Sequence, residues 1–478
     1  TSGEELKETV FKSAFEYLKT EFDEVHGGFG QAPKFPSPHT LLFLLRYWNR
    51  TGDSKSLSMV EKTLQEMSRG GIHDYVGFGF HRYSTDPHWL VPHFEKMLYD
   101  QALLSMAYTE TFQATGIKEF AKTAKSIFTY VLRDMKSAEG LFYSAEDADS
   151  EGEEGKFYLW TRDEIENLLN KDEADLIIKV FNIEKEGNFI DEIKARKTGE
   201  NIFHLQSSLK KISSETGISA KEIEFQLEKV RKKLFTMREK RVHPDKDDKV
   251  LTDWNGLMIA ALAKGAQAFD EPDYLKAAEK AADFILDNMK SSTGRLLHRY
   301  RLGEAAIPAM AADYAFFTWG LLELYEASFQ VKYLDAAIEL TEDFIKHFWD
   351  KKNGGFFFSS DDGEKMLVSW KDFNDGAMPS CNSVSMLNLL RLGRITANSK
   401  FTEMALSISR PVSNEVSRFP AAYTHLLTAF DYGQGPSYEI VISGKSDADD
   451  TKKMLKAIRN RFIPNKVLIL RPAEHQSP

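Results

Sequence analysis

The chain has 478 residues, a formal net charge of −10 and one cysteine, Cys381. A single cysteine excludes internal disulfides, Cys-x-x-Cys redox centres and cysteine-based zinc sites within this chain. Acidic and basic residues are mixed along the sequence, so we expect neither nucleic acid nor a membrane as a partner. The longest apolar run, 41–45, is too short to cross a bilayer, and the first residues lack a secretion pattern. These features predict a cytoplasmic protein, and a start at Thr1 within a helical pattern predicts a preceding segment.

Apolar periodicity separates the predicted helices into two kinds. In 118–135 the apolar residues form one stripe, so this helix buries a single face. In 254–269 and 314–329 apolar residues cover nearly the whole circumference, so such helices must be surrounded on every side. The two kinds alternate. One-sided helices are expected near 5–22, 55–68, 118–135, 273–289, 333–348 and 400–409, each followed by a more buried helix near 38–50, 92–114, 253–269, 310–329, 376–394 and 420–430.

These helices make six hairpins, and an internal repeat supports that number. Three one-sided helices begin alike, with an aromatic residue followed four positions later by Ala124, Ala278 or Ala337. Alternating one-sided and buried helices are what a double ring requires, so we predict a mainly α protein built as an (α/α)6 barrel. An open helical solenoid is the competitor, but its helices would be more equal in burial and spacing.

Two segments interrupt or follow this pattern. Residues 144–249 form one long insertion with an acidic opening and a polar helical middle, in which Thr161 and Glu164 predict a helix capping box. Residues 437–478 change to strand, helix and strand. We therefore expect a barrel of residues 1–436 that carries the insertion, and a small α/β appendage of residues 437–478.

Polar residues gather where the buried helices begin. If the ring closes, these N-terminal ends meet at one mouth, where backbone N–H groups favour anionic or hydroxyl-rich ligands. Aromatic rings beside carboxylates and amides suit a sugar, so we expect a small, sugar-like ligand there. The alternative is that the Asp residues are helix caps and the aromatic rings belong to the core. The substrate-binding candidates are Lys34, His88, Trp89, Asp100, Asp147, Asp149, Asp253, Trp254, Asn255, Tyr314, Asp375 and Asn382.

Residues 70–104 (GGIHDYVGFGFHRYSTDPHWLVPHFEKMLYDQALL), which we call the signature stretch, concentrate histidines before a buried helix. We predict His93 and His81 as proton-transfer groups and Glu95 as an orienting or acid-base carboxylate. Pro92 suits the first position of the helix, which would place His93 and Glu95 in its first turn. A zinc site from His81, His88 and His93 is the alternative, but HExxH spacing does not occur. We therefore predict neither a metal nor another cofactor.

Paired carboxylates would instead suggest glycoside hydrolysis, with Glu95, Asp253 and Asp313 as candidates. Asp313 is also a candidate catalytic group for proton transfer. The acidic run from Asp147 matches the first half of an EF-hand loop, but Tyr158 stands where the bidentate Glu is required. A solvated loop or a lid over the mouth fits this run better.

Five blocks carry a family resemblance: 27–38 (GGFGQAPKFPSP), the signature stretch, 144–160, 247–262 and 375–383. They resemble the spermatogenesis-associated protein 20 family of thioredoxin-domain-containing proteins, over essentially the whole chain. The resemblance implies the fold of the six-hairpin glycosidase and N-acylglucosamine 2-epimerase superfamily, without an established activity. It also implies an N-terminal thioredoxin-like domain, to which nothing here corresponds. Where the family has Pro-Ser-Gly-Asn this chain has Cys381, which we expect to be a small buried residue.

The sequence thus favours acid-base chemistry of the isomerase or epimerase type on a carbohydrate-like substrate. Two alternatives remain open besides the glycoside hydrolase. The chain could be a non-catalytic module that binds ligands for a missing thioredoxin-like domain, or a helical scaffold without a pocket.

Overall fold

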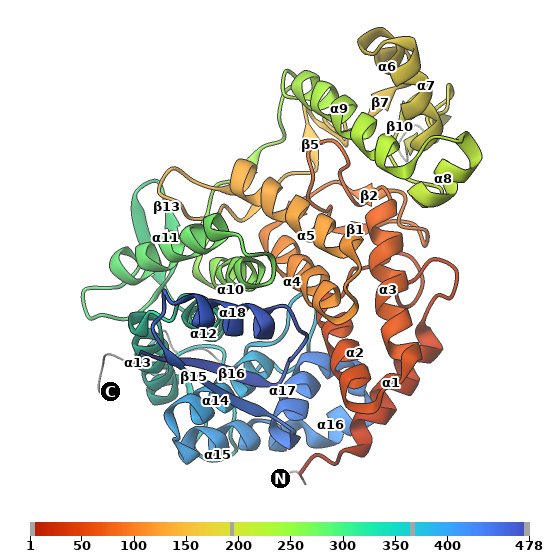
Figure 1. Ribbon diagram of the computed structural model, residues 1–478. Coiled ribbons are helices and arrows are strands. Elements are labelled where there is room, and N and C mark those ends of the chain that lie inside the picture. The colour runs from red at the N-terminus through yellow and green to blue at the C-terminus, as the bar shows by residue number, and fades with distance from the viewer. Residues whose placement is uncertain (1–4, 192–195, 364–368, 473–478) are drawn as a thin grey trace.

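The computed structural model describes residues 5–191, 196–363 and 369–472. Six helices form the inner ring, and each packs against the next until the last meets the first (Figure 1). The ring closes because these helices carry apolar residues on all faces and need cover on every side. In ring order they are α2 (Pro38–Thr51), α4 (Leu98–Thr115), α10 (Thr252–Phe269), α12 (Ala311–Ser328), α14 (Cys381–Thr396) and α17 (Thr424–Gln434).

The outer ring consists of one-sided helices that cover the inner ring. They are α1 (Thr9–Glu21), α3 (Ser54–Arg69), α5 (Lys118–Tyr130) with a π-helical turn at Val131–Met135, α11 (Pro272–Asn288), α13 (Val331–Phe348) and α15 (Ser399–Ile408), with the short α16 (Ser413–Arg418) flanked by 3-10 turns at Arg410–Val412 and Pro420–Tyr423. The predicted (α/α)6 barrel is therefore confirmed.

One predicted helix start is wrong. Residues 92–97 are extended: β2 (Pro92–His93) pairs with β1 (Tyr83–Ser84), and β3 (Lys96–Met97) pairs with β4 (Ala145–Glu146). The second inner helix begins only at Leu98, because the backbone before it is paired in β2 and β3. His93 and Glu95 consequently lie before the helix, not in its first turn. The fifth and sixth inner helices also start a few residues later than predicted, at Cys381 and Thr424.

The insertion between α5 and α10 builds a lobe beside the barrel (Figure 1). Its helices pack around their own apolar cluster, in which Ile165, Ile177 and Ile223 are buried. The predicted capping box of Thr161 and Glu164 starts its first helix. The elements are β5 (Asp149–Ser150), β6 (Glu153–Glu154), β7 (Trp160–Thr161), α6 (Arg162–Leu168), α7 (Lys171–Val180), β8 (Ile190–Asp191), β9 (Arg196–Lys197), β10 (Glu200–Asn201), α8 (Leu209–Thr216), α9 (Ala220–Arg238) and β11 (Lys246–Asp247).

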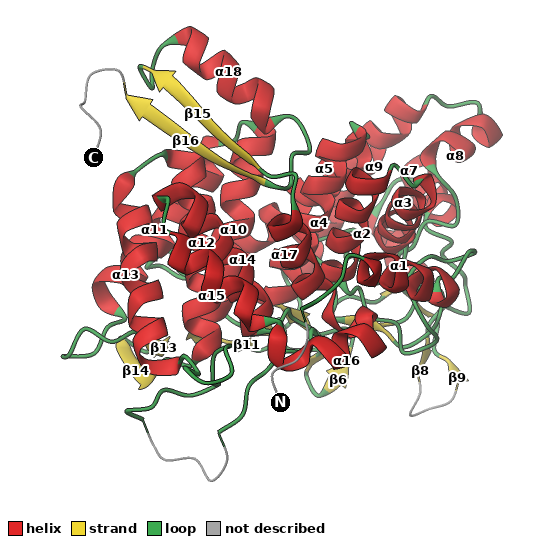
Figure 2. Cartoon of the chain, turned by 90° about the horizontal axis from the view of Figure 1, so that it is seen from below, coloured by secondary structure: helices red, strands yellow, loops and turns green. Residues whose placement is uncertain are grey.

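The two ends of the barrel carry different additions (Figure 2). At the end where inner helices begin, β12 (Val250–Leu251), β13 (Leu297–Arg301) and β14 (Glu304–Pro308) form an antiparallel sheet. At the opposite end lies the appendage, in which β15 (Tyr438–Gly444) and β16 (Lys466–Pro472) are parallel and joined by α18 (Asp449–Arg459). The appendage packs on α10, α12 and α14. The division into domains at residue 436 stays a prediction.

Amide side chains in the first turns of inner helices hold the turns that follow outer elements. Asn255 accepts from the backbone N–H of Phe142 at 2.9 Å and donates to its carbonyl at 2.9 Å. Asn382 makes the same pair of bonds with Phe356, and Gln101 makes it with Phe80. We call these three pairs the amide clamps. The same two-bond contact between an amide side chain and a backbone residue thus occurs at three inner helices.

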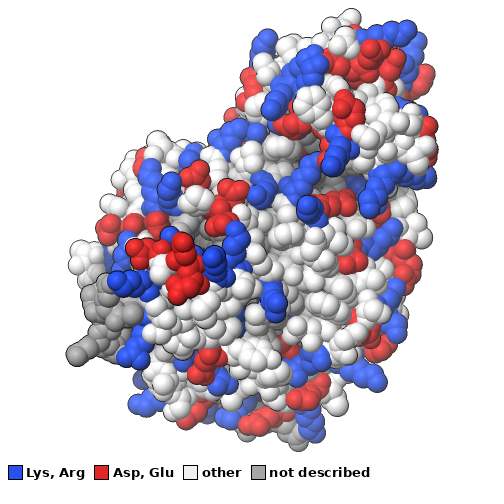
Figure 3. Space-filling view, in the orientation of Figure 1, with Lys and Arg blue, Asp and Glu red and all other residues white. Residues whose placement is uncertain are grey.

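Within the described ranges, no helix is both long enough and apolar enough to cross a membrane. On the face seen in Figure 3, acidic and basic side chains are interspersed over barrel and lobe.

Candidate functional site

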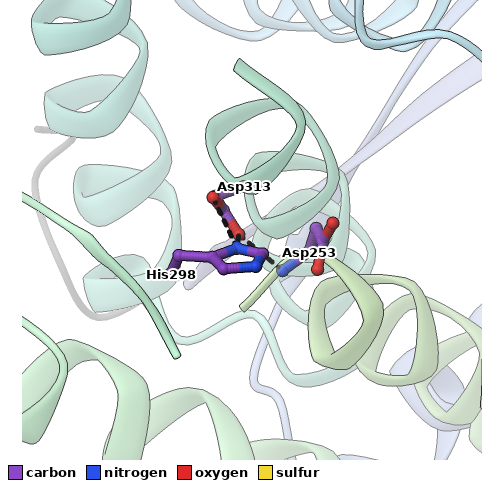
Figure 4. A group of neighbouring side chains, drawn as sticks. All are labelled: Asp253, His298 and Asp313. Atoms are coloured by element: carbon purple, nitrogen blue, oxygen red, sulfur yellow. Dashed lines mark hydrogen bonds and ion pairs between the residues drawn. The ribbon is translucent and has the colours of Figure 1, made fainter. Parts of the chain in front are cut away.

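Three titratable side chains meet where α10 and α12 begin (Figure 4). Asp253 is in the first turn of α10, Asp313 is in the first turn of α12, and His298 is on β13. Their ligand atoms all lie within 4.8 Å of one another. We call this group the Asp-His-Asp cluster. It joins two predicted residues to one that the sequence did not single out.

Asp313 holds the cluster in place. Its Oδ1 accepts from Nδ1 of His298 at 2.8 Å and from the backbone N–H of Asp253 at 3.1 Å, and its Oδ2 accepts from the N–H of Met310 at 2.8 Å. Asp313 is 0 % exposed. Because its carboxylate accepts from Nδ1, that nitrogen carries the proton, and Nε2 of neutral His298 has a free lone pair.

The other two members have shifted pKa values. Burial, followed by the charge of Asp313, raises the pKa of Asp253 to about 7. Burial by itself would lower the pKa of His298, but its hydrogen bond to Asp313 and the charges of Asp313 and Asp253 raise it above the ordinary value. A buried carboxylic acid with a raised pKa beside a histidine is suited to proton transfer.

A second polar group borders this cluster through two aromatic rings. Trp254, next to Asp253, meets Tyr99 edge to face with ring centroids 4.9 Å apart. Beyond Tyr99, Arg82 pairs with Glu95 at 3.0 Å, and His93 contacts Glu95 at 3.6 Å and Glu154 at 2.8 Å. The hydrogen bonds to Glu154 and Glu95 raise the pKa of His93 to about 9. His93 and Glu95 therefore form a half-buried ion-paired group at the same end of the barrel.

Asp100 lies beneath this group in the first helical turn of α4. It is 5 % exposed, and its Oδ2 has no hydrogen-bond partner among the described residues. Burial raises its pKa well above the ordinary value, which favours the neutral form of the carboxyl group.

The signature stretch has a structural centre of its own. Asp74 accepts from Nζ of Lys96 at 2.8 Å and from both terminal nitrogens of Arg238 on α9, also at 2.8 Å. His81 is 2 % exposed beside this trio, with Nδ1 at 2.8 Å from the carbonyl of Phe94. Burial holds the pKa of His81 well below the ordinary value, which keeps the ring neutral.

The three histidines of the zinc alternative have separate partners. His81 bonds to Phe94, His93 to Glu154, and His88 to Nε2 of His26 at 3.0 Å. In the parts of the chain that are described, two groups have metal-ligand spacing: the Asp-His-Asp cluster, and His347 with Asp361 and Asp362. In the first of these, both oxygens of Asp313 already accept protein hydrogen bonds.

Several predicted substrate contacts occupy structural positions. Lys34 is 0 % exposed and donates to Asp23 at 2.8 Å, while its ammonium lies over the buried ring of Trp89. Asn255 and Asn382 belong to the amide clamps. Tyr314 points to the outer ring, where its hydroxyl donates to Asp343 at 2.6 Å.

Asp375 is buried between two helix starts. It accepts from the N–H groups of Ser380, His425 and Leu426, which places it as a cap of α14 and α17. Asp147 and Asp149 are exposed on and beside the β5–β6 hairpin. Cys381 is 4 % exposed, as predicted, and burial raises the pKa of its thiol.

Sequence reasoning missed His298. Its one signal is local: Leu297 and Tyr300 are followed by the turn residue Gly303 shortly before Asp313, so a hairpin could carry His298 back to the start of α12. Arg82, Tyr99 and Glu154 were missed as well, because their contacts depend on the pairing of β1 with β2 and on the β5–β6 hairpin.

Comparison of sequences shows which known proteins this chain is related to. It is 37% identical over 98% of its length to human spermatogenesis-associated protein 20, and equally to the rat protein. An uncharacterized protein of Caenorhabditis elegans is 32% identical over 96% of the chain. The chain spans 64% of the human relative, 63% of the rat relative and 66% of the worm relative. No family model matches the chain.

Among solved structures, cellobiose 2-epimerase from Bacillus thermoamylovorans matches with a TM-score of 0.53, 11% identity, and coverage of 85% of this chain and 87% of the other. A D-mannose isomerase matches with a TM-score of 0.53, 14% identity, and coverage of 84% and 83%. At such identities the likeness concerns the fold alone. By sequence this chain is a homologue of spermatogenesis-associated protein 20, and its fold is similar to those of cellobiose 2-epimerase and D-mannose isomerase.

Proposed function

We propose that this chain is the barrel of a sugar isomerase or epimerase that uses the Asp-His-Asp cluster to move a proton. The observation that carries the proposal is the pairing of a free Nε2 on His298 with an acid, Asp253, whose pKa is raised to about 7. Asp313 acts on the substrate only through His298, which it orients. His298 and Asp253 thus replace His81 and His93 in the catalytic role.

The chemistry is a balanced exchange of protons. Nε2 of neutral His298 removes the proton from the carbon beside the sugar carbonyl, and Asp253 gives its proton to the carbonyl oxygen, so that an enediol forms. Addition of a solvent proton to the other face of that carbon gives the epimer, while Asp253 takes back the hydroxyl proton and His298 releases its proton to solvent. Transfer of the proton from His298 to the neighbouring carbon, while Asp253 accepts the proton of the other enediol hydroxyl, gives the aldose-ketose isomer. The half-buried Trp254, backed by the buried ring of Tyr99, provides apolar surface for the ring of the sugar.

The group around Arg82, His93 and Glu95 fits the more distant part of a substrate. Its side chains are between 25% and 39% exposed, so hydroxyl groups can reach them. The similar folds of cellobiose 2-epimerase and D-mannose isomerase support this class of substrate. Glycoside hydrolysis is less well supported, because both oxygens of buried Asp313 accept protein hydrogen bonds.

The proposal is tested by proton exchange with solvent. Mannose, glucose and cellobiose are incubated with the protein in D2O, and loss of the C2 proton signal is followed by NMR together with the appearance of isomers. His298→Gln and Asp253→Asn should each lower the exchange rate about 100-fold or more, since one positioned acid or base contributes about 10²- to 10⁴-fold. His243→Gln, at a histidine with a 45% exposed side chain, is the matched control and should keep the wild-type rate.

An exchange rate that survives in the His298 variant would refute the assignment. Sugar binding without exchange would favour the alternative of a non-catalytic module that serves a thioredoxin-like domain.

A further inference from the structure

The interior of the barrel contains a cavity that the proposed reaction does not use, and it extends from His425 at the start of α17 to the appendage at the opposite end. It has a volume of about 80 Å³ and lies between the inner helices and the appendage. Residues 458, 459, 461–464 and 466 of the appendage form one wall, and side chains of α2, α4, α10, α12, α14 and α17 form the others. This volume is room for several water molecules or one small ion.

Positive charge exceeds negative charge in the lining. The carboxylates are Glu110, Glu323 and Glu326, whereas the cations are Arg46, Lys264, Arg391, Arg459, Arg461 and Lys466. Arg459 is used elsewhere, because it donates to the carbonyls of Glu326 and Ala327 at the end of α12. The other five cations still outnumber the three carboxylates.

Each carboxylate in the lining is already paired with two cations. Glu110 contacts Arg46 and Lys264. Glu323 contacts Arg391 at 2.8 Å and Lys264 at 3.5 Å. Glu326 contacts Arg391 at 2.8 Å and Lys466 at 3.4 Å. The carboxylates are therefore satisfied, and a cationic ligand would find no unpaired acid here.

Two buried donors in the lining lack partners. His425 is 2 % exposed, and neither of its ring nitrogens has a hydrogen-bond partner in the described structure. The hydroxyl of Tyr432, also 2 % exposed, is unpartnered within the same ranges. The ring of His425 packs at 5.2 Å from that of Trp319, which also lines the cavity. A buried N–H or O–H group is stable when it meets an acceptor.

We propose that this cavity binds a small oxyanion, a phosphate or a carboxylate, between the inner helices and the appendage. Its oxygens would accept from His425, Tyr432 and Lys466, and its charge would offset the excess of cations. Since Lys466 belongs to β16 while His425 and Tyr432 belong to α17, the anion would connect the appendage to the barrel.

The test is a thermal-shift and calorimetric titration of the whole chain. Sodium phosphate and sodium malonate are each compared with sodium chloride at equal ionic strength, so that the two arms distinguish a phosphate from a carboxylate ligand. We expect at least one of the two oxyanions to raise Tm by about 2 °C or more at concentrations well above Kd, because binding to the folded state stabilises it. Chloride should give no such shift.

Three substitutions locate the site. His425→Phe keeps a ring against Trp319, Tyr432→Phe removes only a hydroxyl, and Lys466→Met removes a charge. Each should weaken binding of the oxyanion about tenfold. Tyr438→Phe, at an exposed tyrosine of the appendage outside the cavity, is the control and should bind like the wild type.

Equal shifts with chloride, no shift with either oxyanion, or undiminished binding in all three variants would overturn the proposal. If one variant fails to fold, the two others still decide the question.

Discussion

The two ends of the barrel treat buried carboxylates in opposite ways. At the end where inner helices begin, Asp253 lies beside Asp313 and His298, and burial followed by the charge of Asp313 raises its pKa to about 7. At the other end, Glu110 and Glu323 are just as buried, but Arg46, Lys264 and Arg391 outweigh burial and lower their pKa values to about 2. The first arrangement leaves an acid that can exchange its proton. The second fixes charges and joins helices.

The largest loss in the free energy of unfolding is expected from Arg391→Met, at the end where the carboxylates are ion-paired. This change leaves Glu323 and Glu326 buried with fewer cations, and removing one partner of a buried ion pair costs about 3–5 kcal/mol. Arg394→Met, on the same helix at a 44% exposed side chain, should change the free energy of unfolding by less than about 1 kcal/mol. Urea denaturation followed by circular dichroism measures both. Equal losses would mean that the buried ion pairs do not stabilise this end.

A smaller loss in the free energy of unfolding is expected from Asn255→Ala, at the end where inner helices begin. The variant loses both bonds to Phe142 and one to Leu251, and buried backbone groups left unsatisfied should cost about 2–3 kcal/mol in the free energy of unfolding. Asn288→Ala, at an exposed asparagine near the end of α11, is the matched control and should stay near the wild type. Chemical denaturation of the two variants gives the comparison. A wild-type value for Asn255→Ala would show that the amide clamp is dispensable.

The smallest effect concerns the pH dependence of stability. The pKa of Asp253 is raised in the folded protein, so its contribution to stability is fully present below its unfolded value of about 3.9 and is lost as pH rises through about 7. Asp253→Asn cannot lose a proton. The Tm of the variant minus that of the wild type should therefore increase between pH 5 and pH 8, as differential scanning calorimetry can measure. A difference that does not vary with pH would place the pKa of Asp253 near its ordinary value.

The sequence predicted the barrel better than the site, for a physical reason. Burial on one face or on all faces leaves a periodic pattern in each helix, so the twelve helices and their alternation could be read directly. The site depends on which side chains meet across segments distant in the chain. Asp253 and Asp313 were found because helix starts attract polar residues, whereas His298 reaches them through a hairpin with a weak pattern.

The signature stretch shows the converse case. Its crowding of histidines with Glu95 and Asp100 suggested catalysis, but His81 is buried beside Asp74, Lys96 and Arg238 and against aromatic rings. Polar residues also gather beside glycines where buried ion pairs hold two segments of a chain together. Asn255 and Asn382, predicted as substrate contacts, bond to the backbone in the amide clamps, since a polar side chain at a helix start can bond to a backbone as well as to a ligand.

The bond between Asp74 and Arg238 has a consequence for synthesis. The two residues are 164 positions apart, and Arg238 follows almost the whole insertion. At about 5–20 residues per second, a ribosome needs roughly 10–30 s to travel from one codon to the other. During that interval Asp74 can bond to Lys96 and to the backbone N–H groups of Val76 and Gly77. In a nascent chain, its ion pair with Arg238 can therefore form only after the last helix of the lobe has been made.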